Sequence, residues 1–422
     1  MINVGVAPEM HGMATSSSLA GYAGRTTASS RRVEVLNRLL ARSWRSGWTE
    51  RPTLQPDEMV AAARRATKLD DFGADAGWRA RLDVLAGALV AEAALSPLGR
   101  TIAHGQLVGA LKNRLRAQAL WERHPEILDR PIPAPVIVLG QMRSGTTRVQ
   151  RLLAQDHRLA HTRFFESWNP VPRQERDDRK MRARLGLACV RLLNPDFMTI
   201  HPTGIVEADE EIGLHSLSLF GSVFESQWRV PSFAAYCEGI DSRPIYAEFR
   251  KLLKTLSWLR GGRPKPQILK VPQFTQDLDA VLQIFPDARL ICLDRPEAAL
   301  VASSASLVRN QMRLQSASVD PHWIGAEWCR KIALRRQRTA VARATTNAPQ
   351  LDLSYEAMNR DWQGEMARVY RFLNLPLDLA TEQRMASYLG RSHAARLARH
   401  RYSLAEFGLT TNSSGQVVPA AA

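Results

Sequence analysis

Glycines, hydroxyl side chains and one arginine are concentrated between Gly140 and Thr147, directly after the apolar run Val136–Leu139. A buried strand that ends at a glycine and turns into a helix offers consecutive backbone N–H groups, and the helix dipole adds a favourable potential for an anion. Hydroxyls and a guanidinium are further donors to phosphate or sulfate oxygens. A simple helix-capping turn would not require this combination, so we expect an anion site. Its candidate ligands are Gly140, Arg143, Ser144, Gly145, Thr146 and Thr147.

The spacing of this loop is similar to the nucleotide-binding pattern GxxxxGK[ST], except that Thr146 stands where the lysine would be. That lysine serves the β- and γ-phosphates, and the hydroxyl after it serves Mg²⁺. Here the cation stands three residues earlier, at Arg143. A ligand with one 5′-phosphate and one attached sulfate needs no metal bridge, and we expect no metal. The alternative is a nucleotide kinase or NTPase with an altered loop, for which Asp294 is the candidate Mg²⁺ ligand.

The run RSGTT, from Arg143 to Thr147, resembles the 5′-phosphosulfate loop of the PAPS-dependent sulfotransferases, in the arginine form common among bacterial and protein-tyrosine members. The cytosolic members usually carry lysine at the position of Arg143. The resemblance extends over about residues 100–410, and Lys112–Asp129 resembles the helical lead-in of the bacterial family. It implies an enzyme that moves a sulfuryl group from 3′-phosphoadenosine 5′-phosphosulfate (PAPS) to a hydroxyl, leaving 3′-phosphoadenosine 5′-phosphate (PAP).

The second family signature is an arginine at a strand end, followed eight residues later by a serine, and the two bind the 3′-phosphate. Arg295 and Ser303 have this separation, although the usual Arg-Asp-Pro reads Asp294-Arg295-Pro296 here. A guanidinium and a hydroxyl one helical face away can share a phosphate. The alternative is an Arg295 that forms a salt bridge with Asp294 and a serine on a helix surface.

The segment His400-Arg401-Tyr402-Ser403, followed by Phe407-Gly408-Leu409, resembles the HxYS…FGL segment of the family. The resemblance suggests that Arg401 or Arg399 closes over the nucleotide. A solvated basic tail is the alternative reading of the same residues.

Sulfuryl transfer needs cations for the charge that develops on the departing phosphate. Arg143 is the first candidate. Lys270 is the second, because a lysine that ends a parallel strand points into the crevice where such sheets bind ligands; a lysine that snorkels to solvent is the alternative. The segment Lys270–Phe274 resembles the family's Lys-Ser-Pro-Gln-His, so Phe274 stands where the family has histidine. This departure leaves a catalytically silent PAP-binding protein as an alternative.

The reaction also needs a base for the acceptor proton. Glu166 follows the first helix, where many bacterial members carry a base glutamate, and its neighbours Phe164, Phe165 and Trp168 predict a pKa raised by desolvation. A surface glutamate in a loop is the alternative. His201 and Glu211, in a stretch that resembles the bacterial His…Glu-x-Asp-Glu-x-Ile, are secondary candidates.

The elements that must position these residues alternate between short apolar runs and helical patterns. After Val136–Leu139, the runs are Ile268-Leu269, Leu290–Leu293 and Leu351–Leu353. Strands that alternate with helices predict a parallel β-sheet with helices on its faces, and therefore an α/β fold with a P-loop-like phosphate loop.

We expect four regions along the chain, the third with a helical insertion. Residues 1–33, rich in Ser, Ala, Thr and Gly, are expected to be disordered. Residues 34–130 form a helical N-terminal region, and 131–411 form the α/β domain, with a helical insertion at about 170–265 that could hold the acceptor pocket. Residues 412–422 are expected to be a flexible tail.

The composition of the chain limits the binding partners and the location that we expect for the protein. The net charge is +16, but only eight of the 57 cations are lysine and no compact basic run has interleaved aromatics, so we expect no nucleic-acid partner. The four cysteines are scattered, the N-terminus lacks a secretory pattern and no apolar run has membrane-spanning length, which predicts a cytoplasmic protein. The expected partner is a small-molecule hydroxyl acceptor. A lipid or polyketide alcohol, a phenol, a sugar and a peptide tyrosine all fit, and the apolar middle region favours a lipophilic alcohol.

Overall fold

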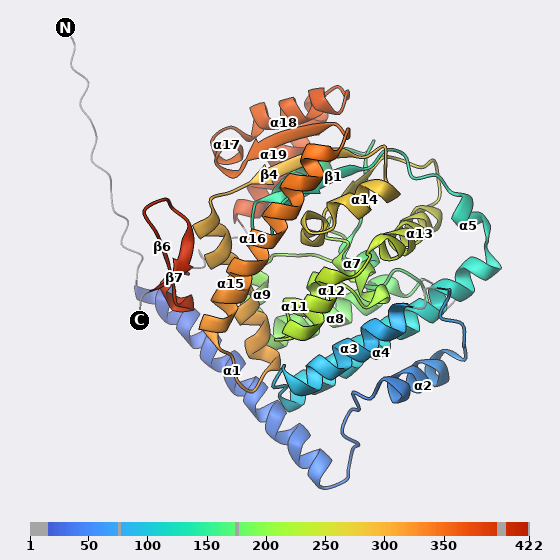
Figure 1. Cartoon of the computed structure of the whole chain (residues 1–422), viewed down its shortest axis with the longest axis vertical. Coiled ribbons are helices and arrows are strands. Elements are labelled where there is room, and N and C mark those ends of the chain that lie inside the picture. Colours follow the sequence, from blue (N-terminus) through green and yellow to red (C-terminus); the bar gives the residue numbers. More distant parts are fainter. Residues whose placement is uncertain (1–15, 75–76, 174–176, 395–401, 421–422) are drawn as a thin grey trace.

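A five-stranded parallel sheet with the strand order β2-β3-β1-β4-β5 is the framework of the protein, and its neighbouring strands β1 and β4 are labelled in Figure 1. The computed structural model describes all residues except 1–15, 75–76, 174–176, 395–401 and 421–422. The strands of the sheet are β1 Val136–Leu139, β2 Ala160–His161, β3 Gln267–Leu269, β4 Arg289–Asp294 and β5 Gln350–Ser354, and an antiparallel hairpin contains β6 Leu409–Thr411 and β7 Val417–Pro419. The sheet and its helices confirm the predicted α/β fold.

Helices cover both faces of the sheet, which explains why all four residues of β1 are buried. Successive side chains of a strand point to opposite faces. Leu139 packs in a cluster with Phe249 on one face, whereas Val138 packs with Leu152 and Val369 on the other. The apolar runs were therefore sufficient to find β1, β3, β4 and β5. The two-residue strand β2 has no apolar run and was missed.

The helices fall into three groups along the chain. The N-terminal group is α1 Ser16–Arg45, α2 Pro56–Thr67, α3 Gly77–Ala91, α4 Pro97–Arg123 and α5 Glu126–Asp129. Between β1 and β3 lie α6 Thr146–Leu153, α7 Phe164–Trp168, α8 Arg179–Leu193, α9 Pro195–Ile200, α10 Ile212–His215, the 3₁₀ helix η1 Ser216–Ser218, α11 Ser222–Glu225, α12 Pro231–Gly239 and α13 Arg243–Arg260. After β3 come η2 Pro272–Thr275, α14 Leu278–Ile284, α15 Glu297–Gln315, α16 Pro321–Thr345, α17 Tyr355–Arg360, α18 Trp362–Phe372, α19 Leu379–Ala394 and η3 Ala405–Phe407.

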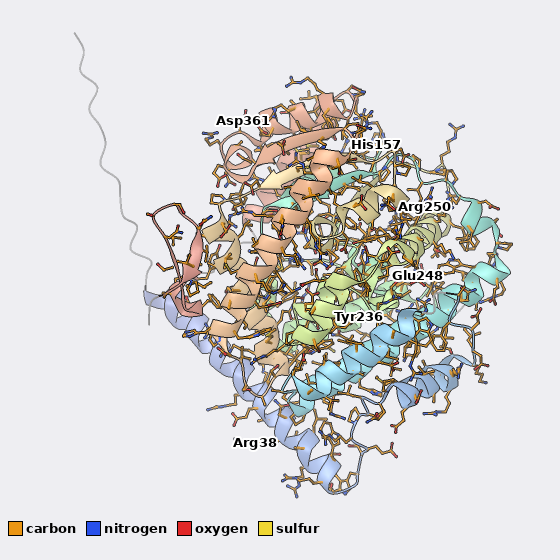
Figure 2. All side chains as sticks on the ribbon, in the orientation of Figure 1. Arg38, His157, Tyr236, Glu248, Arg250 and Asp361 are labelled. Carbon is orange, nitrogen blue, oxygen red and sulfur yellow. The ribbon has the colours of Figure 1, made fainter. Side chains whose placement is uncertain are left out.

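The N-terminal helices share their hydrophobic core with the helical insertion. Leu82 and Leu107 of α3 and α4 lie in one buried cluster with Phe224 and Trp228 of the insertion. A largely buried ion pair crosses the same interface, with 2.6 Å between Arg114 Nη1 of α4 and an Oε1 of Glu248 in α13 (Glu248 is labelled in Figure 2). The helical region at 34–130 is thus packed onto the α/β domain through its insertion.

Two ends of the chain differ from the expectation of disorder. Helix α1 begins at Ser16, well before the expected boundary at residue 33; residues 1–15 lie outside the described part. Residues 412–420 of the expected tail are also structured, because β7 pairs with β6, Val417 is buried and the Val417 N–H donates to Glu297 Oε1 at 3.2 Å. Backbone pairing and burial of an apolar side chain stabilise what composition alone suggested was flexible. Among the described residues, no helix has both the length and the apolar character that crossing a bilayer requires.

Candidate active site

The candidate phosphate loop, Gly140–Thr147, runs from the end of β1 into the start of α6. A Cβ atom on Gly140 would lie 2.6 Å from Ser144 Oγ and 2.9 Å from the Leu293 carbonyl oxygen, so only glycine fits there. The Ser144 hydroxyl is buried and donates to the Gln141 carbonyl at 2.7 Å. Ser144 therefore closes the loop on itself in this structure, and Gly140 lets the loop pass close to β4.

Gly145 is the N-cap of α6 and has a φ of +94°, a left-handed conformation that favours glycine. A Cβ atom at this position would lie 2.8 Å from Cδ2 of Tyr355, which begins α17. Thr146 is buried and Thr147 is partly exposed at the first turn of the helix. The helix therefore presents its N-terminus, with Thr147, at the carboxyl edge of the sheet.

Arg143 has a φ of +73° although it is not glycine, and strained residues of this kind are typical of ligand-binding loops. Its side chain donates from Nε to Ser303 Oγ at 3.0 Å and from Nη1 to the Ile200 carbonyl at 3.1 Å. Burial lowers the pKa of the guanidinium, but arginine stays protonated in proteins. A fixed, largely desolvated cation thus lies beside the loop.

Arg295 and Ser303 both come to this loop. Arg295 Nη1 donates to the Arg143 carbonyl at 2.9 Å, and its guanidinium lies 4.3 Å from the centre of the Tyr355 ring. The alternative salt bridge to Asp294 is not the arrangement found, because Asp294 pairs with Arg336 at 3.2 Å. The order Asp-Arg-Pro therefore leaves Arg295 facing the loop.

The C-terminal segment returns to the same place through Tyr402. Arg399 and Arg401 lie outside the described residues. Burial alone would raise the pKa of Tyr402, but a hydrogen bond with Ser303 and the positive charges of Arg295 and Arg143 bring the pKa below its usual value. Tyr402 thus lies beside Arg143 and Arg295, which together with Lys270 form the cationic cluster around the loop.

Lys270, at the end of β3, is buried and contacts the phosphate loop directly. Its Nζ donates to Thr147 Oγ1 at 2.9 Å and forms an ion pair with Glu210. Its backbone N–H donates to Glu211 Oε2 at 2.8 Å. The structure therefore brings Lys270 next to the first turn of α6 and rejects the reading of a lysine that snorkels to solvent.

The acidic stretch holds two different kinds of carboxyl group. Glu211 is fully buried, and desolvation raises its pKa to about 8 despite the hydrogen bond from Lys270. Asp209 lies 3.6 Å from His201, measured between Oδ1 and Nε2, and the interaction with His201 holds the Asp209 pKa low against the opposing effect of burial. His201 directly follows Ile200, whose carbonyl accepts from Arg143. An imidazole with a carboxylate 3.6 Å away therefore lies next to Arg143 and its neighbours at the loop.

Glu166 has surroundings that the sequence did not predict. Its side chain is fully buried and forms ion pairs with Arg163 and Arg260. Desolvation would raise its pKa, but these two arginines lower it to about 2. The prediction that neighbouring aromatic rings raise the pKa of Glu166 is wrong. The charges of Arg163 and of Arg260, 94 residues away in the sequence, outweigh the effect of desolvation. In the described part of the chain, the hydrogen bonds and ion pairs of the Glu166 side chain go to Arg163 and Arg260, and none goes to the phosphate loop or to Lys270.

Phe274 is fully buried in the cluster that contains Phe249 and Val271. The position where the resemblance implies histidine is therefore part of the hydrophobic core.

Sequence reasoning missed three contributors to the site: Tyr355, the Ile200 carbonyl and Ser304, whose hydroxyl donates to the Met142 carbonyl at 3.2 Å. Only Tyr355 had a signal, since an aromatic residue directly after β5 stands at the same edge as the other site residues. In the described residues, no cluster of His, Cys, Asp or Glu side chains is suited to hold a metal ion.

Comparison with known proteins gives a consistent result. A sequence model described as the sulfotransferase family matches residues 135–379. The chain is similar to the solved structure of sulfotransferase STF1 from Mycobacterium tuberculosis, with a TM-score of 0.75 and 29% identity over 86% of this chain and 97% of the other. It is also similar to sulfotransferase STF9 from Mycobacterium avium, with a TM-score of 0.72 and 26% identity over 84% of this chain and 92% of the other. No curated protein sequence matches the chain.

Proposed function

The chain belongs to the sulfotransferase family, and from this premise we propose that it transfers a sulfuryl group from PAPS to the hydroxyl of a small acceptor, giving PAP and a sulfate ester. The observation that carries the proposal is the convergence of Arg143, Lys270 and Arg295 at the carboxyl ends of the adjacent strands β1, β3 and β4. Parallel sheets bind their ligands in the crevice at this edge.

The donor would lie across this edge in two parts. The backbone N–H groups of the loop, Thr147 and Arg143 suit the 5′-phosphosulfate, while Arg295 and Ser303 suit the 3′-phosphate. Arg143 donates here to Ser303 and to a backbone carbonyl, and anion oxygens are stronger acceptors that can replace both. Gly140, Ser144, Gly145 and Thr146 hold the loop in shape, and Arg401 remains a prediction for closing over the nucleotide.

In the proposed reaction, the acceptor oxygen attacks sulfur as the bond between sulfur and the 5′-phosphate oxygen breaks, and PAP leaves with the electron pair. Negative charge then grows on the departing phosphate. Arg143 and Lys270 are the cations next to that position, and their fixed contacts favour stabilisation without reorganisation.

The acceptor proton needs a base, and we propose His201 in place of Glu166. His201 is partly exposed, lies 3.6 Å from Asp209 and follows the residue that contacts Arg143. This arrangement repeats the pairing of an imidazole with an orienting carboxylate that activates hydroxyl nucleophiles in other enzymes. Glu166, by contrast, has both carboxylate oxygens engaged by arginines.

The acceptor we propose is a small hydroxyl compound, with a lipophilic alcohol favoured by the apolar insertion. The four cysteines are free thiols, which agrees with the proposed cytoplasmic location.

Transfer of label tests the proposed function. The full chain is incubated with ³⁵S-labelled PAPS and a lipid and metabolite extract, without Mg²⁺, and the labelled product is identified. A labelled sulfate ester that Arg143→Ala abolishes is expected. PAP binding without any transfer would instead support a silent nucleotide-binding protein. Thermal stabilisation by ATP that requires Mg²⁺ would support the kinase reading.

A further inference from the structure

Large apolar side chains are exposed on two neighbouring helices, α1 and α8. They are Val35 and Leu39 on α1 and Met181, Leu185 and Leu192 on α8, each about half exposed or more. Half of the ten large apolar side chains that are exposed in the described part of the chain thus lie on these two helices. Scattered exposed apolar residues need no explanation, but a concentration of this kind marks an interaction surface.

The apolar residues of α8 form a single stripe. Met181, Leu185 and Leu192 stand at positions i, i+4 and i+11, so at about 100° per residue they lie within roughly 40° of one another around the helix. The helix contains five cations and no acidic residue. Arg184 and Arg191, which lie together along one side of the stripe, are exposed and have no ion-pair partner among the residues that the structure describes.

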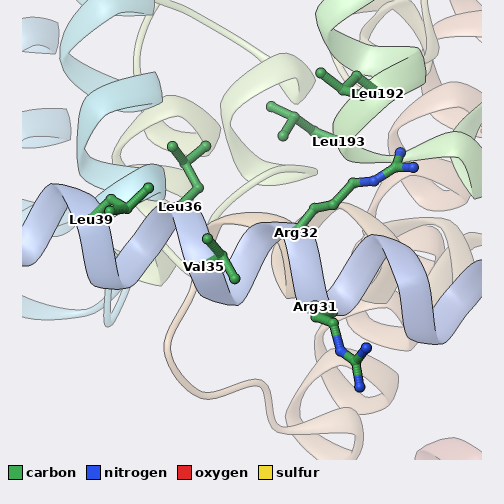
Figure 3. Close-up of a pocket in the computed structure, with 7 residues that line it drawn as sticks. All are labelled: Arg31, Arg32, Val35, Leu36, Leu39, Leu192 and Leu193. Atoms are coloured by element: carbon green, nitrogen blue, oxygen red, sulfur yellow. The ribbon is translucent and has the colours of Figure 1, made fainter.

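Helix α1 continues this surface across a groove. The groove has a volume of about 750 Å³ and is lined by Val35, Leu36 and Leu39 from α1 and by Leu192 and Leu193 from the end of α8 (Figure 3). Arg31 and Arg32 of α1 also line it, and the Arg32 side chain extends toward the end of α8 (Figure 3). We call this surface the α1–α8 face and define it by Val35, Leu39, Leu185, Leu192, Arg184 and Arg191.

We propose that the α1–α8 face docks on the surface of an anionic lipid bilayer. An apolar stripe flanked by cations is the composition of helices that lie in a membrane interface, where the leucines enter the boundary of the acyl chains and the arginines meet anionic headgroups. The charges disfavour a second copy of this chain, because two α8 helices would bring only cations together. A nucleic acid would neutralise the arginines but would leave the leucines in water.

The position of the face connects it to the candidate active site. Helix α8 ends at Leu193 and is followed by α9, whose last residue, Ile200, accepts a hydrogen bond from Arg143 through its carbonyl oxygen. Docking through α8 would therefore bring the cationic cluster close to the bilayer surface. The docking itself does not depend on sulfuryl transfer, so its test needs neither donor nor turnover.

The test is sedimentation of the full chain with lipid vesicles. We expect binding to vesicles of phosphatidylcholine mixed with phosphatidylglycerol, little binding to phosphatidylcholine alone, and weaker binding as NaCl screens the charges. Removing cations with Arg184→Ala and Arg191→Ala should lower the partition coefficient about fivefold for each. Leu185→Glu with Leu192→Glu should lower it more than tenfold, since two buried apolar side chains become charged.

Matched controls lie far from the face. Leu379→Glu changes a leucine of α19 that is 70% exposed, and Arg360→Ala removes an exposed arginine of α17; neither should alter vesicle binding. Unchanged circular dichroism melts verify that each variant is folded. If the double leucine variant unfolds, vesicle binding by the two arginine variants tests the proposal. The proposal is overturned by equal binding to neutral and anionic vesicles, by no binding, or by controls that lose binding equally. A dimer that Leu192→Glu dissociates would also overturn it and assign the face to self-association.

Discussion

Glu166 and Glu211 are both fully buried carboxyl groups, and their surroundings move their pKa values in opposite directions. Arg163 and Arg260 lower the pKa of Glu166 to about 2, so this group is ionised at neutral pH and ties α7 to α13. Among the described residues no cation forms an ion pair with the Glu211 carboxylate, and burial raises its pKa to about 8. The number of arginines that reach a buried carboxyl group therefore decides its protonation state here.

Glu166→Gln should cost stability rather than PAP affinity. The folded pKa of about 2 lies below the ordinary 4.5, so the contribution of Glu166 is fully present above about pH 4.5 and is lost as the pH falls toward 2. The shift corresponds to about 3 kcal/mol of unfolding free energy at pH 7. Urea unfolding at pH 7 and at acid pH measures this difference, which should shrink in acid. A variant with full stability but no turnover would return Glu166 to the role of base.

Arg295→Ala should weaken binding of PAP by about 2 kcal/mol, the cost of losing a charge-assisted contact. Adenosine 5′-phosphosulfate, which lacks the 3′-phosphate, should lose much less affinity. Isothermal titration calorimetry of the variant with each nucleotide measures the two losses of affinity separately. The matched control is Arg336→Ala, because Arg336 contacts Asp294, Glu297 and the Arg295 carbonyl on the outer side of the same turn. Equal losses for both nucleotides would assign Arg295 to another part of the donor.

His201→Gln should lower kcat by about 10²- to 10⁴-fold, the usual contribution of a general base, with little change in PAP affinity. The measurement uses the acceptor identified by labelling. Asp209→Asn should lower kcat as well, since it removes the carboxylate charge 3.6 Å from the imidazole. His157→Gln is the control, because His157 is an exposed histidine outside the site (labelled in Figure 2). Near-normal turnover of His201→Gln would show that His201 is not the base. Electrostatic stabilisation by Arg143 and Lys270 would then account for the catalysis.

At the scale of elements, strand ends bring the site together. β1, β3 and β4 are neighbours in one parallel sheet, so the residues that follow them meet at one edge. The loop after β1 makes its turn with Gly140 against β4 and Gly145 against α17. Its shape thus depends on two close approaches that only glycine permits.

Gly145→Ala should therefore distort the loop and weaken PAP binding at least tenfold, with about 2 kcal/mol lost in stability. A left-handed φ of +94° and a Cβ atom 2.8 Å from the Tyr355 ring both oppose the alanine. Gly105→Ala in α4 is the control, since a Cβ atom there meets nothing within 4 Å and alanine favours helix. Calorimetry with PAP and thermal melts test both variants. Equal behaviour of the two would mean that the loop tolerates the added methyl group.

At the scale of the whole molecule, the N-terminal helices and the α/β domain are one packed unit. The cluster that begins at Leu54 in the N-terminal region extends to Ile245 in the insertion. The ion pair between Arg114 and Glu248 is largely buried at the same interface. The N-terminal helices and the insertion share this one hydrophobic cluster, so separating them would expose apolar side chains of both.

We therefore expect a single cooperative unfolding transition by calorimetry, with equal van't Hoff and calorimetric enthalpies. Deletion of residues 1–130 should yield a chain that aggregates and does not bind PAP, because the insertion loses the partners of Phe224 and Trp228. Two separate transitions, or a truncated chain that binds PAP normally, would show that the N-terminal helices are an independent domain.

The sequence by itself determined the features that depend on consecutive residues. Apolar runs fixed β1, β3, β4 and β5, and the glycines and hydroxyls between Gly140 and Thr147 predicted the loop. These signals are local, because strand burial and loop geometry depend on residues that are adjacent in the sequence.

Only the tertiary structure decided the partners. Arg143 donates to Ser303, 160 residues later, and Lys270 donates to Thr147, 123 residues earlier. Glu166 meets Arg260 across 94 residues, which reverses the pKa shift expected from its aromatic neighbours. Charge state and catalytic suitability depend on which groups packing brings within a few ångströms and on how far water is excluded, and the order of residues along the chain contains neither quantity.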